Sequence, residues 1–126
     1  MTTSHVRSQR ILKHGSPYFT VSCPELVAGA FVVYGLADLS ADAPKYEPLD
    51  WIEVTNLDSA AAVRLILDHG DSFRVPAGAI RQIESHPYRV VQIRNEGATT
   101  IAAGLVSFLA QREPIKVDSY IRRFKL

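Results

Sequence analysis

The stretch WIEVTNLDSAAAVRLIL, residues 51–67, decides the fold class of this chain. Residues 51–55 are rich in β-branched and aromatic side chains and alternate between apolar and polar positions. Residues 56–59, Asn-Leu-Asp-Ser, have the composition of a turn. Residues 62–67 then place Val63, Leu65 and Leu67 on one face of an extended segment. A period of two, in short segments bounded by turn residues, predicts half-buried β-strands.

The same pattern of short strands and turn residues continues on both sides of this stretch. We expect further strands at residues 18–22, 30–36, 73–75, 80–84, 88–94 and 99–109. The positions to which we assign turn or structural roles are Gly70, Pro76, Gly78, Asn95 and Gly97. Turn signals that recur at roughly eight to twelve residues are typical of a sandwich or barrel. The predicted fold class is therefore all-β: an antiparallel, jelly-roll-like β-sandwich with extended N- and C-terminal arms.

Two segments of the first half depart from strict alternation. Residues 30–36 form a continuous run of β-formers, which predicts a strand buried on both faces. Residues 38–50 contain Pro44 and Pro48, and we interpret them as a loop.

Residues 99–112 fit two interpretations. As a helix they would place four apolar side chains on one face, namely Ile101, Leu105, Phe108 and Leu109. The threonines at the start of the segment favour a strand. Gly104 also favours a strand, because glycine costs about 1 kcal/mol in a helix interior.

Charge divides the chain into a body and two basic ends. Residues 1–14 carry three basic side chains and no acid, and residues 112–126 carry five basic side chains against two acids. The segment between them, residues 15–111, has a net charge of −5. We therefore predict an N-terminal arm at 1–14, a β-sandwich domain at 15–113 and a C-terminal arm at 114–126.

The predicted arms have features of interaction segments. Apolar residues alternate in part of the C-terminal arm, as in a strand that adds to a neighbouring sheet, and Tyr120 and Phe124 are aromatic anchors of the kind that interfaces favour. Basic arms on an acidic body suit contact with a neighbouring copy, and folding back onto their own domain is an equal alternative. The residues that we expect at subunit interfaces are Arg7, Arg10, Lys13, Ile115, Val117, Tyr120, Ile121, Arg122, Arg123 and Phe124.

Several functional classes lack support in the sequence. The net charge of +1 argues against direct nucleic-acid binding, and no apolar run approaches the roughly 20 residues that span a bilayer. Cys23 is the single cysteine, which excludes an intrachain disulfide and a cysteine zinc site. No two of the four histidines have metal-ligand spacing, and no nucleophile-elbow or phosphate-loop motif occurs. We therefore expect no metal, no cofactor and no enzyme activity.

Five arginines punctuate the predicted strands. We expect them to lie on a solvated outer face or to guard strand edges. They are Arg64, Arg74, Arg81, Arg89 and Arg94.

Residues 70–81, GDSFRVPAGAIR, resemble the second conserved motif of cupins, in which Gly and Pro-x-Gly precede a metal-binding histidine. Arg81 occupies the ligand position here, and a permanently protonated guanidinium cannot ligate a metal. The first cupin motif does not occur upstream. The resemblance implies a jelly-roll-like sandwich, and it leaves open a metal-free, cupin-like domain in which Arg81 points inward toward a small acidic ligand.

A second resemblance covers residues 51–107. Its elements are Val-Thr-Asn at 54–56, Phe-Arg-Val-Pro-Ala-Gly at 73–78, Val-Gln-Ile-Arg-Asn-Glu-Gly at 91–97 and Ala-Gly-Leu-Val at 103–106. This pattern is similar to small β-sandwich virion proteins of tailed bacteriophages, the capsid decoration or cement class. The resemblance implies a structural protein of a virion assembled in the host cytoplasm. It also implies a homo-oligomer, often a trimer, whose partners are capsid or other virion proteins.

Overall fold

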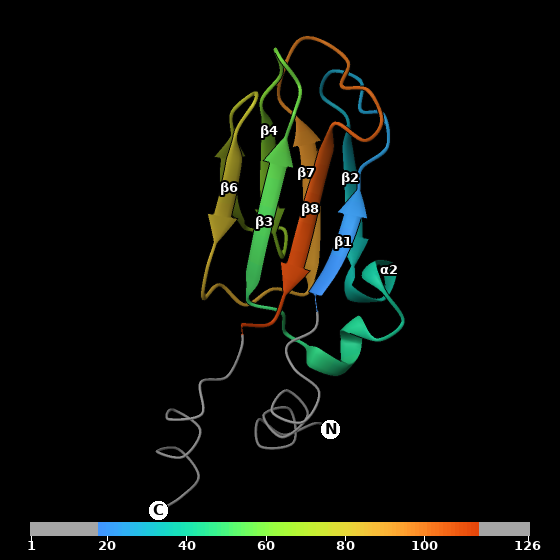
Figure 1. Ribbon diagram of the computed structural model, residues 1–126, viewed down its shortest axis with the longest axis vertical. Helices are drawn as coiled ribbons and strands as arrows, with labels where there is room; N and C mark the ends of the chain where they lie inside the picture. The colour runs from blue at the N-terminus through green and yellow to red at the C-terminus, as the bar shows by residue number, and fades with distance from the viewer. Residues whose placement is uncertain (1–17, 114–126) are drawn as a thin grey trace, which may run out of the picture.

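A computed structural model describes residues 18–113 of the chain, and within this part eight strands form two four-stranded antiparallel sheets (Figure 1). One sheet has the order β1-β8-β3-β6 and the other the order β2-β7-β4-β5. The strands are β1 (Tyr18–Ser22), β2 (Phe31–Gly35), β3 (Trp51–Asn56), β4 (Val63–Leu67), β5 (Asp71–Val75), β6 (Ile80–Ile83), β7 (Val90–Asn95) and β8 (Val106–Gln111). A short helix α2 (Leu36–Leu39) and a 3-10 helix η1 (Ala43–Tyr46) lie between β2 and β3.

The strands pair as in a single long β-hairpin whose two halves are folded over into two sheets. β1 pairs with β8, β2 with β7, β3 with β6, and β4 with β5, so each of the first four strands meets its counterpart in the last four. Pairing of β3 with β8 and of β4 with β7 then completes the two sheets. This is the jelly-roll arrangement of two packed sheets. The predicted all-β, jelly-roll-like sandwich is confirmed, whereas the two predicted arms lie outside the described residues.

The core lies between the inner faces of the two sheets. Val63, Leu65 and Leu67 of β4 are all buried on one face, as their alternation predicts. Their counterparts from β3, β7 and β8 are Ile52, Val54, Val91, Ile93, Phe108 and Ala110. Each fully buried large apolar side chain contributes about 1.5–3 kcal/mol, so this interior is the main source of the free energy of folding.

Two predictions about the first half of the chain are corrected. Residues 30–36 contain β2, but β2 is an edge strand whose outward Phe31 and Val33 are 60% and 40% exposed, so the run is not buried on both faces. Residues 38–50 are not all loop, because they include the end of α2 and all of η1. In η1 a proline occupies the first helical turn, where it needs no hydrogen-bond donor.

The last strand is shorter than predicted. β8 begins only at Val106, and residues 99–105 form a loop in which Ile101 makes an isolated bridge with Leu26. Gly104 has φ +84°, a left-handed conformation that neither a strand nor a helix accepts and that glycine adopts at little cost. The helical interpretation of residues 99–112 is therefore wrong.

Three of the predicted turn positions, Gly70, Pro76 and Gly78, flank β5. In the turn before β5, the Gly70 N–H donates to the Leu67 carbonyl at 3.0 Å, while Asp68 and His69 have positive φ. After β5, the Ala79 N–H donates to the Pro76 carbonyl, and Gly78 takes the positive φ of +73°. A residue with positive φ at the third position of such a turn is most easily glycine.

Two buried asparagines close the loops at the end of the sandwich drawn at the top of Figure 1. The Asn95 amide donates to the Leu26 and Thr99 carbonyls at 2.9 and 2.8 Å and accepts from the Gly97 N–H at 2.8 Å. Asn56 makes an equivalent set of bonds to the loop that follows β3 and to the turn after β5. Buried amides of this kind fix loop backbone groups that water cannot reach.

Gly97 is required by close packing and not by its backbone angles. A Cβ atom at this position would lie 2.8 Å from Ala61 Cα and even closer to Ala61 Cβ. Asn95 and Gly97 are thus structural residues, and they act by closing two loops against each other.

Candidate interaction surface

Among residues 18–113, no group of three or more His, Cys, Asp or Glu side chains could hold a metal ion. No helix within these residues has the length and hydropathy needed to cross a membrane. Cys23 is buried, and burial raises the pKa of its thiol to about 11, so the thiolate form is suppressed at neutral pH.

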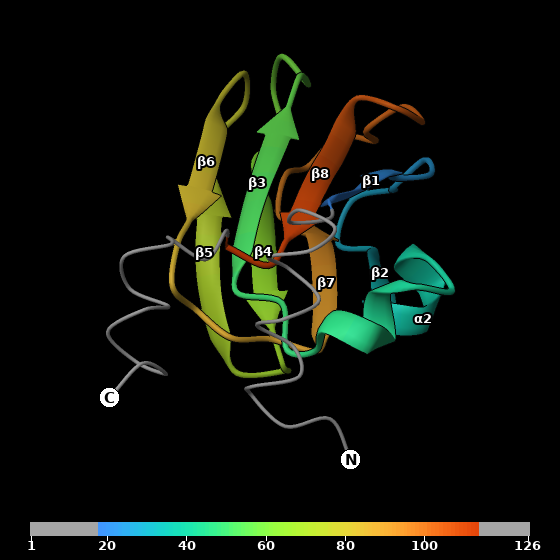
Figure 2. The ribbon, with the colours of Figure 1, turned by 60° about the horizontal axis from the view of Figure 1, so that its bottom comes forward.

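One end of the sandwich contains α2, η1, the turn before β5 and the segment 84–89 (Figure 2). We call this end the base. Tyr18, the first described residue, lies directly opposite Gln111 in the β1–β8 register. The described chain ends two residues later, at Glu113. The chain therefore enters and leaves the sandwich side by side at the base. The predicted interface residues of both arms, from Arg7 to Lys13 and from Ile115 to Phe124, lie outside the described residues.

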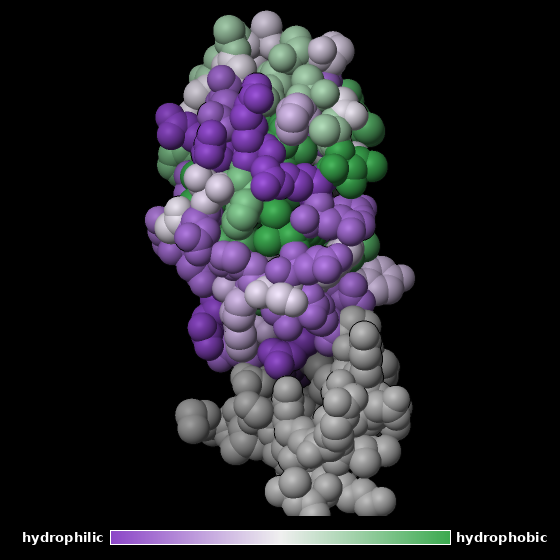
Figure 3. Space-filling view, turned by 90° about the vertical axis from the view of Figure 1, so that its left-hand side faces the viewer, coloured by the Kyte–Doolittle hydropathy of each residue, from purple (hydrophilic) through white to green (hydrophobic). Residues whose placement is uncertain are grey.

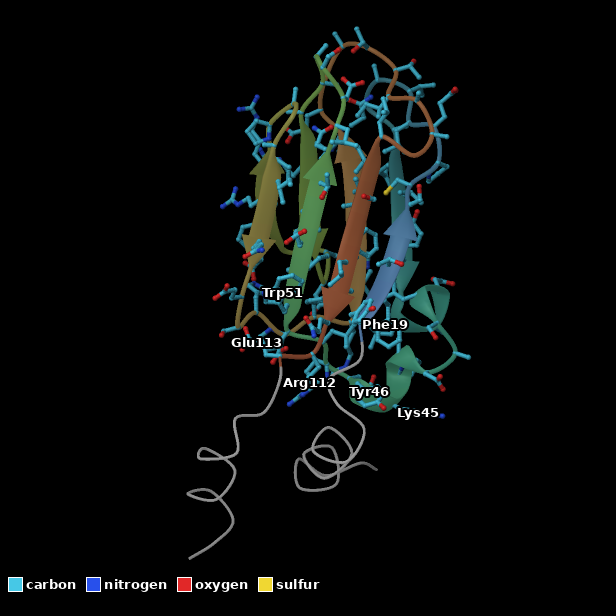
Figure 4. All side chains as sticks on the ribbon, viewed as in Figure 1. Phe19, Lys45, Tyr46, Trp51, Arg112 and Glu113 are labelled. Carbon is cyan, nitrogen blue, oxygen red and sulfur yellow. The ribbon has the colours of Figure 1, made fainter. Side chains whose placement is uncertain are left out.

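Three half-buried aromatic side chains lie around this point, from β1, η1 and β3 (Figure 4). They are Phe19, Tyr46 and Trp51. Arg112 anchors the end of β8 among them, because its Nη1 donates to the Pro48 carbonyl at 2.9 Å. Partly exposed aromatics beside an arginine are the composition that protein interfaces favour.

Hydrogen bonds to carboxylates hold the segments of the base together. Asp50 accepts from the Glu113 N–H, and Glu113 accepts from the Ser85 N–H at 2.7 Å. Burial raises the pKa of Asp50 above its ordinary value, and the backbone hydrogen bond from Glu113 partly offsets this rise. The fully buried Tyr88 fixes a further segment of this end, because its hydroxyl donates to the Trp51 carbonyl at 2.7 Å.

The base is strongly acidic. Its segments at 36–50, 68–71, 84–89 and 112–113 contain eight carboxylates and three basic side chains. The carboxylates are Asp38, Asp42, Glu47, Asp50, Asp68, Asp71, Glu84 and Glu113, and the basic side chains are Lys45, Arg89 and Arg112. Such a surface attracts basic polypeptide segments.

The base also contains a His–Asp pair without a nucleophile. His86 Nε2 lies 2.9 Å from Asp71 Oδ2, and the imidazole packs edge-on against Phe73 with ring centroids 5.6 Å apart. The neighbouring Ser85 hydroxyl bonds to Glu113 instead of the imidazole. General-base activation of a serine needs the hydroxyl on the imidazole nitrogen, which this arrangement does not provide.

Arg81 lies at the open edge of the sandwich and not inside it. Its guanidinium packs over the Phe73 ring at 5.3 Å from the centroid, and its Nη1 donates to the Arg74 carbonyl at 2.9 Å. Figure 3 faces this edge and shows hydrophobic surface framed by hydrophilic residues. Arg81 is exposed, and apolar side chains fill the space between the sheets. This packing does not favour a ligand-holding, cupin-like interior.

The remaining strand arginines lie on the outside, as predicted. Arg64, Arg74 and Arg94 point outward from β4, β5 and β7, and Arg89 lies exposed at the base, 3.6 Å from Glu47. Sequence reasoning missed the aromatic cluster of the base and the role of Asn56. The sequence does contain a signal for Asn56. It continues the alternation of Ile52 and Val54, so it is expected on the inward face at the end of the strand.

Comparisons with known proteins give a fold likeness alone. No protein-family model matches the sequence, and no curated protein matches it. A solved structure described as a solution NMR structure of a de novo designed double-stranded beta-helix is similar, with 15% sequence identity and a TM-score of 0.41. The match covers 77% of this chain and 99% of the designed one.

Proposed function

We propose that this protein is a non-catalytic structural protein of a virus particle, which binds and stabilises capsid or other virion subunits through its sandwich surface and its arms. The observation that carries the proposal is the pairing of Tyr18 with Gln111, because it starts both basic arms from one point of an acidic base. Two arms tethered at one point engage a neighbour cooperatively, since binding of the first raises the effective concentration of the second.

The composition of the base supports the same proposal. Half-buried aromatics at the exit of the arms offer anchor positions for a neighbouring chain, and the acidic surface attracts basic arms from a second copy. The resemblance to capsid decoration proteins of tailed bacteriophages favours a homo-oligomer, with a trimer expected, on the surface of the virion.

The first experiment tests the virion role itself. Particles of the virus whose genome encodes this chain are purified through a density gradient, and their proteins are quantified by mass spectrometry. We expect the chain in a fixed ratio to the major capsid protein. If it is lost from particles as they are purified, the virion role is wrong.

The second experiment tests the arms. Deletion of residues 114–126 should abolish binding to these particles while the urea midpoint of the body stays the same. The matched control is a full-length chain in which residues 114–126 are scrambled, which keeps length and charge. If the truncated chain binds particles as tightly as the full chain, the arm mechanism is refuted.

A third measurement tests the oligomer. Sedimentation velocity of the full chain should give the mass of a trimer at micromolar concentration. A monomer at all concentrations would remove the homo-oligomer from the proposal.

A further inference from the structure

The strand register brings three arginines into one row on the outer face of the β2-β7-β4-β5 sheet. Arg94 of β7 lies directly opposite Arg64 of β4, and Arg64 lies directly opposite Arg74 of β5. We call these three residues the arginine row. Phe31 of β2 occupies the next position along it, opposite Arg94. Because adjacent strands lie about 4.8 Å apart, the three arginines span about 10 Å of the sheet surface.

The row is only partly neutralised. Arg64 donates from Nε to Glu96 Oε1 at 2.8 Å and from Nη1 to Ser72 Oγ at 3.0 Å. Within residues 18–113, no hydrogen bond or ion pair joins the guanidinium of Arg74 or of Arg94 to another side chain. Like charges directly opposite one another in a sheet are destabilising, so the row lowers the stability of the isolated domain. A bound anion would remove that cost.

The surroundings of the row indicate the chemistry of its ligand. The Glu96 carboxylate already binds Arg64, which shows that a carboxylate fits the row. A shallow cleft beside it is lined by Arg64, Arg94, Glu96 and backbone at Gly29 and Gly97. Apolar side chains share the face: Phe31 is 60% exposed, Val33 is 40% exposed, and Ile66 is half-buried. Arginines beside exposed apolar and aromatic side chains form a surface suited to a polypeptide.

Other occupants are less well matched. The described residues carry twelve acids and seven basic side chains, so a nucleic acid is repelled at long range by the body. The chain's own ends cannot supply the anion, because residues 1–17 contain no acid and residues 114–126 contain one.

We propose that this face binds an acidic segment of a partner polypeptide, whose carboxylates bind the arginine row and whose apolar side chains contact Phe31 and Val33. The inference goes beyond the virion role and holds for any partner that carries such a segment. It concerns the upper outer face of one sheet, whereas the arms start at the base.

The test uses the full-length chain and a short fluorescein-labelled peptide of alternating glutamate and leucine, with binding followed by fluorescence anisotropy at low salt. Replacing both free arginines, Arg74→Gln with Arg94→Gln, should weaken binding about tenfold, since two charge-assisted contacts are lost. The control Lys45→Gln with Arg89→Gln makes the same change of net charge at the base and should change affinity by less than about twofold. The arms are present in every variant, so any contribution from them stays constant.

A second variant should change affinity in the opposite direction. Glu96→Gln removes the carboxylate that competes for Arg64, so the peptide should bind about threefold more tightly. Glu84→Gln, with the same charge change at the base, is its control. The doubly substituted Arg74/Arg94 variant should also unfold at the same urea concentration as the natural chain or at a higher one, because the repulsion has been relieved.

Four results would overturn the proposal. The first is that the Arg74/Arg94 variant binds the peptide as tightly as the natural chain. The second is that the Lys45/Arg89 control loses as much affinity as the Arg74/Arg94 variant. The third is a lower urea midpoint of the Arg74/Arg94 variant, which would make the row structural. The fourth is that another occupant binds more tightly than the peptide and loses affinity in the Arg74/Arg94 variant. That occupant could be a labelled single-stranded oligonucleotide, or a second copy of the chain detected by sedimentation.

Discussion

Replacing Asn95 by alanine removes the three hydrogen bonds that close the loops opposite the base. The side-chain amide is fully buried, and it holds the Leu26 carbonyl, the Thr99 carbonyl and the Gly97 N–H. The Leu26 carbonyl keeps a second partner, the Ile101 N–H at 2.8 Å. Alanine therefore leaves two backbone groups without a partner, one carbonyl and one N–H.

The magnitude follows from these two groups. A buried polar group left without a partner costs about 1–3 kcal/mol. Gly97 is half-buried, whereas Thr99 is exposed and its carbonyl can regain a partner from water, so we expect a loss of about 2 kcal/mol in the free energy of unfolding. A domain of this size is stable by about 5–15 kcal/mol, so the variant folds but is clearly weakened.

The assay is urea unfolding followed by the fluorescence of Trp51, the single tryptophan, which lies at the base and away from the substitution. The slope of the transition should be unchanged and its midpoint lower. The matched control is Gln82→Ala, which also deletes an amide but breaks one exposed bond to Glu53 and should cost less than about 0.5 kcal/mol. If Asn95→Ala costs no more than Gln82→Ala, the reasoning about the loop closure is refuted.

Three further predictions use the same measurement. Gly97→Ala should lower the free energy of unfolding by about 2 kcal/mol, because the new methyl group clashes with Ala61. Adding Ala61→Gly should restore part of this loss. If the effects of the two substitutions are simply additive, the residues do not contact each other in this way. Tyr88→Phe should cost about 1–2 kcal/mol, because the Trp51 carbonyl loses its donor, and an unchanged midpoint would show that this bond is not stabilising. Burial raises the pKa of Cys23 from 9.0 to about 11, so the folded state binds the thiol proton more tightly than the unfolded chain does. The free energy of unfolding should therefore fall as the pH rises from about 9 to about 11. A Cys23→Ala variant whose free energy of unfolding falls with the same slope over this range would disprove the prediction.

Much of the local structure could be predicted from the pattern of side chains. Because a strand repeats every two residues, the sequence places Val63, Leu65 and Leu67 on one face, and they are buried together. The sequence predicts a turn at Gly78 after Pro76, and Gly78 has the positive φ that such a turn needs. These inferences succeed because they depend on neighbours within a few residues along the chain.

Errors arose where a segment's environment is set by distant parts of the chain. The run at 30–36 has the composition of a central strand, yet β2 lies at a sheet edge with its outer face in solvent. Residues 99–105 have strand-like threonines, but the close approach of the loops near Leu26 and Cys23 turns them into a loop.

The sequence by itself determined that the chain forms short amphipathic strands between turns, which faces of those strands are apolar, and that basic ends flank an acidic body. Only the tertiary structure decided which strands are neighbours and in what register. That register places Arg94, Arg64 and Arg74 in one row and Tyr18 beside Gln111, although these residues are far apart in the chain. The physical reason is that a period of two specifies burial for each strand alone, whereas pairing depends on how all the inner faces pack together.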